Sequence, residues 1–340
     1  MFDDSWLEDQ QALRRADVGL RRLAEAGARL RREIGEAEEP LLQIGQLDRP
    51  RAVIAAGSEA RFIRAMLEPV CPVPFVAWPA YGLPGWVGAL DLVVVMASES
   101  SSPALVATVH EAVRRGAQLL IACPPASSIA DHAGSSSTIL LPTATADPLA
   151  AAIVSLAALH RMQLGPEVDP WQVADAMDQV ATDCSPYTDV AENPAKDLAT
   201  GLAEVQPLVW GGSVLAARAS RRVAEALRAA SGRAALAADA DELIPVLESA
   251  GPHDPFADPF EDAVSADRRP ALVVLDDGNP ESPIRTAEAR LKAIAERNDI
   301  RVCVIQHASG SDVERYAALL QTGMYTAVYL AVGLGRYLAS

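Results

Sequence analysis

The sequence predicts an α/β protein made of two doubly wound halves, each with a parallel sheet flanked by helices. Three observations support this fold class. From about Arg51 to the end of the chain, short apolar runs alternate with helical segments. The apolar runs, such as Leu92–Met96, are continuous, which is typical of strands buried on both faces. Polar loops lead from several of these runs into the helices, and this alternation of strand, loop and helix is typical of βαβ units.

The chain begins with an Ala-, Leu- and Arg-rich segment, Glu8–Ile34, in which leucines recur at helical spacing. We expect one long helix or two here, docked on the domain that follows. Residues 1–50 are accordingly assigned to an N-terminal helical segment.

Residues 51–160 form the first α/β subdomain. Its expected strands are Ala52–Ala55, Pro74–Val76, Leu92–Met96, Gln118–Cys123 and Thr138–Leu141. Its expected helices are Glu59–Leu67, Pro103–Arg115 and Pro148–Leu159. Pro103 suits the first position of a helix, and Ser102 is its natural N-cap. Ligands of such sheets bind beyond the carboxyl end of a central strand, where backbone N–H groups and serine hydroxyls suit an anion.

Residues 161–200 are assigned to a connector with one helix, Trp171–Ala181, and residues 201–340 to the second subdomain. Strands are expected at Leu208–Trp210, Ala234–Ala238, Ala271–Leu275 and Val302–Ile305. Helices are expected at Val214–Ala230, Asp241–Ser249, Ser282–Arg297, Ser311–Leu320 and Tyr325–Leu338. Gly251–Arg269 is rich in Pro, Asp and Glu, which is typical of an acidic loop or linker.

The composition excludes several classes of function. Among 340 residues, 45 are acidic and 29 basic, and the formal charge of −16 argues against binding to nucleic acid or to an anionic membrane surface. Four cysteines without a C-x-x-C pair indicate buried thiols in a reducing compartment. We find neither a signal peptide nor a membrane span, and expect a soluble, cytoplasmic protein. No complete metal or dinucleotide motif is present, so no cofactor is expected.

Four short motifs carry a family resemblance: Tyr81-Gly82-Leu83-Pro84-Gly85-Trp86, Asp91-Leu92-Val93, Arg114-Arg115-Gly116-Ala117 and Asn193-Pro194-Ala195-Lys196. They resemble motifs of the bifunctional phosphoglucose/phosphomannose isomerases, which consist of sugar-isomerase (SIS) subdomains. The first three match the first subdomain of that family, and the fourth matches the start of its second half. The resemblance implies two flavodoxin-like SIS subdomains, a sugar or sugar-phosphate ligand, and a homodimer or hetero-assembly with a sugar-phosphate enzyme.

The loops that bind phosphate in that family differ in this chain. Glu59 and Glu99 stand where the family places phosphate-binding serines. Two carboxylates aimed at one anion site would repel a phosphate dianion. In the alternative interpretations, Glu59 is a first-turn helix residue favoured by the helix dipole, and Glu99 points into solvent.

The catalytic positions differ as well. Aligned without gaps, the family's proton-transferring Glu falls on Ala229, and its ring-opening His falls on Pro245. Neither residue accepts a proton, whereas general acid–base catalysis needs a titratable group. Glu248 and His253 are the nearest substitutes.

We therefore expect a protein without catalytic activity that binds a carbohydrate derivative or serves as a partner subunit. The candidate ligand-binding residues are Gly57, Ser58, Glu59, Ser98, Glu99, Ser100, Ser101, Ser102 and His307. Two alternatives remain open. One is an active glucose-6-phosphate/mannose-6-phosphate isomerase that uses displaced residues. The other is a cation site formed by the two acidic loops, which would hold an amino sugar or a lysine of a partner.

Overall fold

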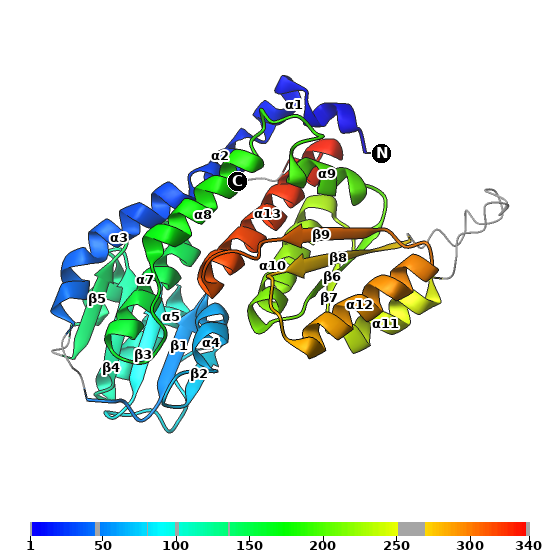
Figure 1. Ribbon diagram of the computed structural model, residues 1–340. Coiled ribbons are helices and arrows are strands. Elements are labelled where there is room, and N and C mark those ends of the chain that lie inside the picture. Colours follow the sequence, from blue (N-terminus) through cyan, green and yellow to red (C-terminus); the bar gives the residue numbers. More distant parts are fainter. Residues whose placement is uncertain are drawn as a thin grey trace. The chain divides into compact units, whose positions relative to one another are not determined.

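The computed structural model describes residues 2–44, 48–79, 81–98, 102–134, 137–250 and 269–337. The chain forms two compact units, here called the N-terminal unit (Ala26–Asp175) and the C-terminal unit (Met1–Glu25 with Ala176–Ser340). Each unit contains one parallel β-sheet flanked by helices (Figure 1), which confirms the predicted α/β class. The N-terminal helices contribute to both units. The sequence-based boundaries at residues 50, 160 and 200 stay a prediction.

The N-terminal unit has a five-stranded sheet in the order β2-β1-β3-β4-β5. Its strands are β1 (Val53–Gly57), β2 (Phe75–Trp78), β3 (Leu92–Met96), β4 (Gln118–Cys123) and β5 (Thr138–Pro142). All five residues of the central strand β3 are buried, because helices pack on both faces of the sheet. The chain winds from β1 towards one edge and from β3 towards the other. The switch point of this sheet therefore lies between β1 and β3.

Helices cover both faces of this sheet. One face carries α3 (Ala26–Gln43), α4 (Ala60–Leu67) and α7 (Pro148–Arg161), and the other carries α5 (Pro103–Arg114) and α6 (Ser128–His132). Local sequence explains how two of them begin. Pro103 and Pro148 occupy the first turns of α5 and α7, where a missing N–H costs nothing. Asp147 caps α7 by accepting hydrogen bonds from the N–H groups of the residues that follow.

The C-terminal unit has a four-stranded sheet in the order β7-β6-β8-β9. Its strands are β6 (Gln206–Gly211), β7 (Leu236–Ala237), β8 (Pro270–Asp276) and β9 (Val302–Gln306). Helices α10 (Val214–Ser231) and α13 (Asp312–Gly333) cover one face, and α11 (Ala240–Ser249) and α12 (Ser282–Arg297) the other. Helix α9 (Pro194–Gly201), η1 (Asp4–Leu7) and α2 (Asp17–Ala24) pack against α13, and α1 (Gln10–Arg15) packs on η1 and α2. The boundary between the units falls within α8 (Pro170–Asp183).

The predicted helices Ser311–Leu320 and Tyr325–Leu338 are wrong as two separate helices. One continuous helix, α13, replaces them and ends at Gly333. Gly323 suggests a break in the sequence, but in the structure it lets α10 pack closely, because an added Cβ would collide with Val223. The predicted N-terminal helix Glu8–Ile34 is also divided differently, since three helices run from Gln10 to Gln43. Helix α6 was not predicted, and strand β7 is shorter than expected.

Three of the four cysteines, Cys123, Cys184 and Cys303, are buried, and all four are free thiols. Burial raises the pKa of Cys184 to about 12 and that of Cys303 to about 11, so both are protonated at neutral pH. Across the described ranges, we find no helix that combines the length and the hydrophobicity that a membrane span requires.

Candidate ligand-binding site

A pocket of about 400 Å³ opens at the switch point of the N-terminal sheet. The loops after β1 and β3 form it, together with the starts of α5 and α7. Four predicted site residues, Gly57, Ser58, Ser98 and Ser102, line it. The other described lining residues are mainly apolar: Ala56, Trp78, Pro79, Met96, Ala97, Ala104, Leu105 and Pro148. Glu99, Ser100 and Ser101 lie outside the described residues.

The shape of this pocket depends on Gly57, which ends β1. Its φ is +121°, a region that residues with a side chain rarely adopt. Gly57 pairs with Met96 of β3, and an added Cβ would collide with the carbonyl oxygen of Met96. Only glycine therefore fits where the two central strands end side by side.

Glu59 follows at the N-cap position of α4, and its side chain accepts no capping hydrogen bond from the N–H groups of the first turn. Its side chain is only 1% exposed, and it is not among the residues that line the pocket. This position agrees more closely with a residue at the start of a helix than with a ligand contact. The prediction that Glu59 contacts a ligand stays untested.

The pocket combines hydroxyl groups with apolar walls. Ser98 is buried, and Ser102 is exposed at the N-cap position of α5, although its side chain makes no capping hydrogen bond. None of the described lining residues is a lysine or an arginine. Recognition of a phosphate dianion would therefore depend on backbone N–H groups and serine hydroxyls alone.

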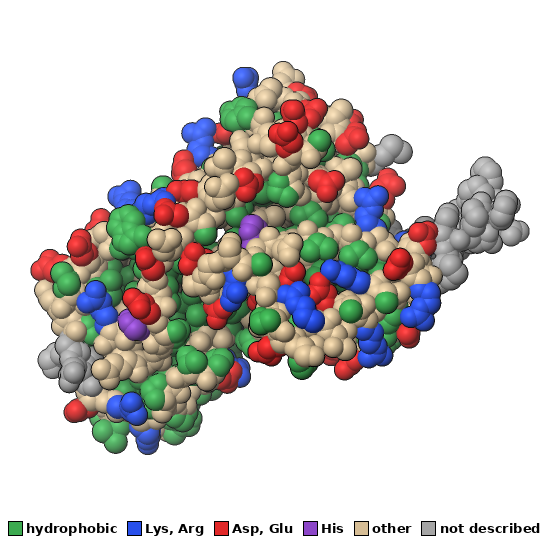
Figure 2. Space-filling view, in the orientation of Figure 1, with side chains coloured by type: hydrophobic (Ala, Val, Ile, Leu, Met, Phe, Trp, Pro, Cys, Tyr) green, Lys and Arg blue, Asp and Glu red, His purple; other side chains and the backbone are tan. Residues whose placement is uncertain are grey.

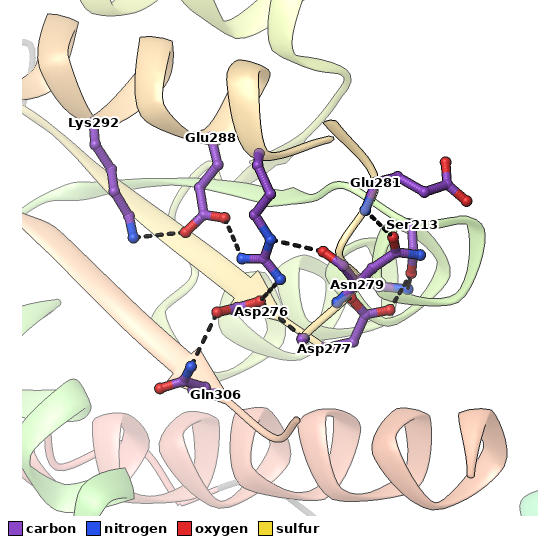
Figure 3. Close-up of polar contacts among 11 residues, drawn as sticks. Ser213, Asp276, Asp277, Asn279, Glu281, Glu288, Lys292 and Gln306 are labelled. Carbon is purple, nitrogen blue, oxygen red and sulfur yellow. Dashed lines mark hydrogen bonds and ion pairs between the residues drawn. The ribbon is translucent and has the colours of Figure 1, made fainter. Parts of the chain in front are cut away.

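The switch point of the C-terminal sheet is built differently (Figure 3). Between β6 and β8, the loop after β6 carries Ser213 and the loop after β8 carries Asp277. The Ser213 hydroxyl donates a hydrogen bond to Asp277 and accepts one of 3.0 Å from the N–H of Ala216. A carboxylate of the chain itself thus lies at the N-terminus of α10, where an anionic ligand would bind.

Asp276, the last residue of β8, belongs to the ion-pair network drawn in Figure 3. Arg285 of α12 contacts Asp276 at 2.9 Å and Glu288 at 2.8 Å, and Lys292 contacts Glu288 at 2.6 Å. Gln306 donates to Asp276 from β9. Burial alone would raise the pKa of Asp276, but the hydrogen bonds from Arg285 and the N–H of Gly278, together with the nearby positive charges, lower it. The carboxylate therefore stays ionised.

His307, the remaining predicted site residue, follows β9 and is partly buried. Its Nε2 lies 3.0 Å from the hydroxyl of Thr322 on α13. Burial lowers the pKa of His307, against a smaller opposing effect of Asp183, so the ring is neutral at pH 7. These contacts account for the residue structurally, and a role in ligand binding stays a prediction.

The two positions on which the ungapped alignment is predicted to place the family's catalytic residues lie on helices of the C-terminal unit. Ala229 is exposed near the end of α10, and Pro245 is exposed within α11. Glu248 is also exposed on α11, and His253 lies outside the described residues. In the part of the chain that the structure describes, His, Cys, Asp and Glu side chains nowhere gather in groups of three or more that would hold a metal ion.

Comparison with known proteins agrees with this architecture. Residues 191–336 match the model of the bacterial phosphoglucose isomerase C-terminal SIS domain. The match covers less than half of the chain and lies within the C-terminal unit. No curated protein is significantly similar to the chain in sequence.

Solved structures extend the SIS likeness to the whole chain. Tagatose-6-phosphate ketose/aldose isomerase from Escherichia coli has a TM-score of 0.63 at 16% identity, covering 98% of this chain and 95% of that one. The C-terminal domain of glucosamine-fructose-6-phosphate aminotransferase from Francisella tularensis also has a TM-score of 0.63, at 12% identity, covering 95% and 98%. A glucose-6-phosphate isomerase-like protein from Thermus thermophilus has a TM-score of 0.56 at 19% identity, covering 99% and 95%. At these identities the likeness shows the fold, which is that of phosphosugar isomerase-like SIS proteins.

Proposed function

We propose that this chain is a SIS protein without catalytic activity that binds a carbohydrate derivative in the pocket between β1 and β3. The observation that carries the proposal is a difference between the two units. The N-terminal unit keeps a pocket at the switch point of its sheet. In contrast, the ungapped alignment predicts that the family's catalytic positions fall on Ala229 and Pro245, which have no titratable side chain.

The lining of the pocket supports a sugar more than a phosphate as the recognised group. Ligand pockets combine apolar and aromatic walls with a few polar groups that set orientation. Here Trp78 and Leu105 are apolar walls, while Ser58, Ser98 and Ser102 offer hydroxyls to the hydroxyls of a sugar. Without a basic side chain among the described lining residues, the pocket lacks the charge that usually pairs with phosphate.

The physiological role that we propose follows from this assignment. A SIS protein that binds a sugar derivative without converting it would act in the cytoplasm as a homodimer, or as the partner subunit of an enzyme of sugar-phosphate metabolism. The solved structures with this fold include isomerases that act on tagatose 6-phosphate, which supports carbohydrate as the class of ligand.

A thermal-shift series tests the proposal. Glucose, mannose, fructose and glucosamine are compared with their 6-phosphates, since a ligand that binds the folded state raises the unfolding midpoint by mass action. We expect a shift with at least one unphosphorylated or amino sugar, reduced in Ser58→Ala and Ser102→Ala. The control variant Ser249→Ala lies on α11 outside the pocket and should keep the full shift.

A coupled isomerase assay with the hexose 6-phosphates accompanies the series. We expect no turnover above the background without protein. Turnover that Ser58→Ala reduces and Ser249→Ala does not would contradict the absence of catalysis and support the active-isomerase alternative. No shift with any sugar would contradict the assignment of the pocket.

A further inference from the structure

A second pocket, of about 420 Å³, opens in the C-terminal unit at the amino ends of β6 and β9. The start of η1, the end of α9 and the residues just before the two strands form it. The volume falls within the range of small-molecule sites. Ligands of a doubly wound sheet bind at the opposite, carboxyl ends of its strands, so this pocket is separate from the switch point of the same sheet.

Three exposed charged side chains line this pocket: the carboxylates of Asp4 and Glu204 and the guanidinium of Arg301. Within the residues that the structure describes, none of these three side chains forms a hydrogen bond or an ion pair, either with one another or with a further residue. Figure 2 shows acidic and basic side chains near one another on the C-terminal unit, where Figure 1 labels α9 and the N-terminus. Opposite charges that line one pocket without pairing leave space for a ligand that pairs with both.

The backbone that carries these side chains is fixed by hydrogen bonds. The N–H of Asp3 donates to the carbonyl oxygen of Gly333 on α13 at 2.8 Å, which places the neighbouring Asp4. The carbonyl oxygen of Arg301 accepts a hydrogen bond of 2.9 Å from the N–H of Leu272 on β8. A site whose walls are ordered in advance loses little conformational entropy when it binds a ligand.

The guanidinium of Arg301 lies against the last residue of α9. A Cβ added at Gly201 would lie 3.1 Å from Nη1 of Arg301 and 3.3 Å from Sγ of Cys303, so glycine leaves the space that the arginine occupies. The carbonyl end of a helix attracts positive charge. The end of α9 therefore favours the guanidinium at this place and would also favour an ammonium group of a ligand.

We propose that this pocket binds a basic amino acid with an aliphatic side chain, such as lysine. Its carboxylate pairs with Arg301, because a guanidinium binds a carboxylate through two parallel hydrogen bonds. Its two ammonium groups pair with Asp4 and Glu204. Phe2 and Val205 also line the pocket and offer apolar contact to the methylene groups between the charged ends.

The numbers of charges favour this class over related ligands. The lining carboxylates outnumber the guanidinium by one, and in a basic amino acid the cations outnumber the carboxylate by one. A neutral amino acid would leave one lining carboxylate unpaired, and a diamine would leave Arg301 unpaired. This site belongs to the C-terminal unit and does not depend on the carbohydrate pocket of the N-terminal unit.

Isothermal titration of the full chain with L-lysine tests the proposal. L-Norleucine has the same carbon chain without the terminal ammonium group, and cadaverine has both ammonium groups without the carboxylate. Each compound is titrated into the wild type, Arg301→Gln and Glu204→Gln. The matched controls are Arg297→Gln and Glu296→Gln, which change exposed side chains of α12 that do not line the pocket. All four substitutions are at exposed positions, so the variants should keep the fold.

We expect saturable binding of one lysine per chain. The affinity should be at least fivefold lower in Arg301→Gln and in Glu204→Gln, and unchanged in the two controls. L-Norleucine and cadaverine should each bind the wild type at least fivefold more weakly than lysine, and higher salt should weaken the binding of lysine. Absence of saturable lysine binding would overturn the proposal, as would equal affinity of Arg301→Gln and Arg297→Gln. Cadaverine that binds as tightly as lysine would also overturn it, since the carboxylate would then not be recognised.

Discussion

Ser213 donates a hydrogen bond from its hydroxyl to Asp277, and this contact joins the loop after β6 to the loop after β8. Ser213 also caps α10, and Asp277 is only 8% exposed, so a carboxylate of the chain lies at the switch point of the C-terminal sheet. The N-terminal sheet has a pocket at the corresponding place. We therefore propose that ligand binding takes place in the N-terminal unit.

Replacing Ser213 by Ala should lower the free energy of unfolding by about 1–2 kcal/mol, the usual value of an N-cap serine. The change also removes a donor to a buried carboxylate, so a loss near the upper limit is expected. Ser213→Thr keeps the hydroxyl and should lose less. Urea denaturation measures the difference, and a change within about 0.5 kcal/mol for Ser213→Ala, equal to that of the exposed control Ser249→Ala, would contradict the account.

A second prediction concerns Glu33 of α3, which is 1% exposed. Its carboxylate accepts hydrogen bonds from the N–H groups of Ala144 at 2.9 Å and Thr145 at 2.6 Å, and from the Thr145 hydroxyl. Glu33→Ala should destabilise the chain by about 2–3 kcal/mol, because it leaves charge-assisted donors unpaired. Thermal and urea unfolding measure this. Glu36→Ala, an exposed position on the same helix, is the control and should change stability little.

A third prediction compares two glycines, one with no room for a Cβ and one with free space around it. Gly57→Ala adds a Cβ that collides with the carbonyl oxygen of Met96 at a φ of +121°, so it should cost about 1–3 kcal/mol and abolish ligand shifts. Gly35→Ala lies on an exposed part of α3 with nothing within 4 Å of the added atom, and should stabilise by about 0.5–1 kcal/mol. If both substitutions lower the free energy of unfolding, or both raise it, then the ends of β1 and β3 do not pack as closely as stated.

A fourth prediction concerns pH. Because burial lowers the pKa of His307 in the folded chain, the unfolded chain binds a proton first as pH falls below about 6.5. The contribution of His307 to stability is therefore complete above that pH and is lost as pH falls towards the folded pKa. His307→Asn should remove this part of the acid sensitivity, seen as a smaller drop in unfolding free energy between pH 7.5 and 5.5. An identical drop in both proteins would contradict the burial of the ring.

The fold was predictable in large part because buried parallel strands are continuous apolar runs, and proline and serine marked the starts of helices. The single helix α13 was not predictable from the sequence. Gly323 permits close packing on Val223, but a glycine at this position looks the same in the sequence as a helix break. Whether the helix continues through Gly323 therefore depends on packing between distant parts of the chain and not on local helix propensity.

The candidate site was predictable only in part. Gly57, Ser58, Ser98 and Ser102 follow strands that end side by side, so chain order was enough to bring them together. The network of Asp276, Arg285 and Gln306 was missed, because it joins two strands and a helix. Its one local signal is the Asp276-Asp277-Gly278-Asn279 turn after a strand. Whether Glu59 faces a ligand depends on side-chain direction, which spacing alone does not give.

The measurement that tests the central claim most directly is isothermal titration of the full chain with each sugar and its 6-phosphate. The account predicts that one unphosphorylated or amino sugar binds at least as tightly as its 6-phosphate, with affinity reduced by Ser58→Ala and retained in Ser249→Ala. A 6-phosphate that binds tenfold or more tightly than its parent sugar, about 1.4 kcal/mol, would show recognition led by phosphate and contradict the account.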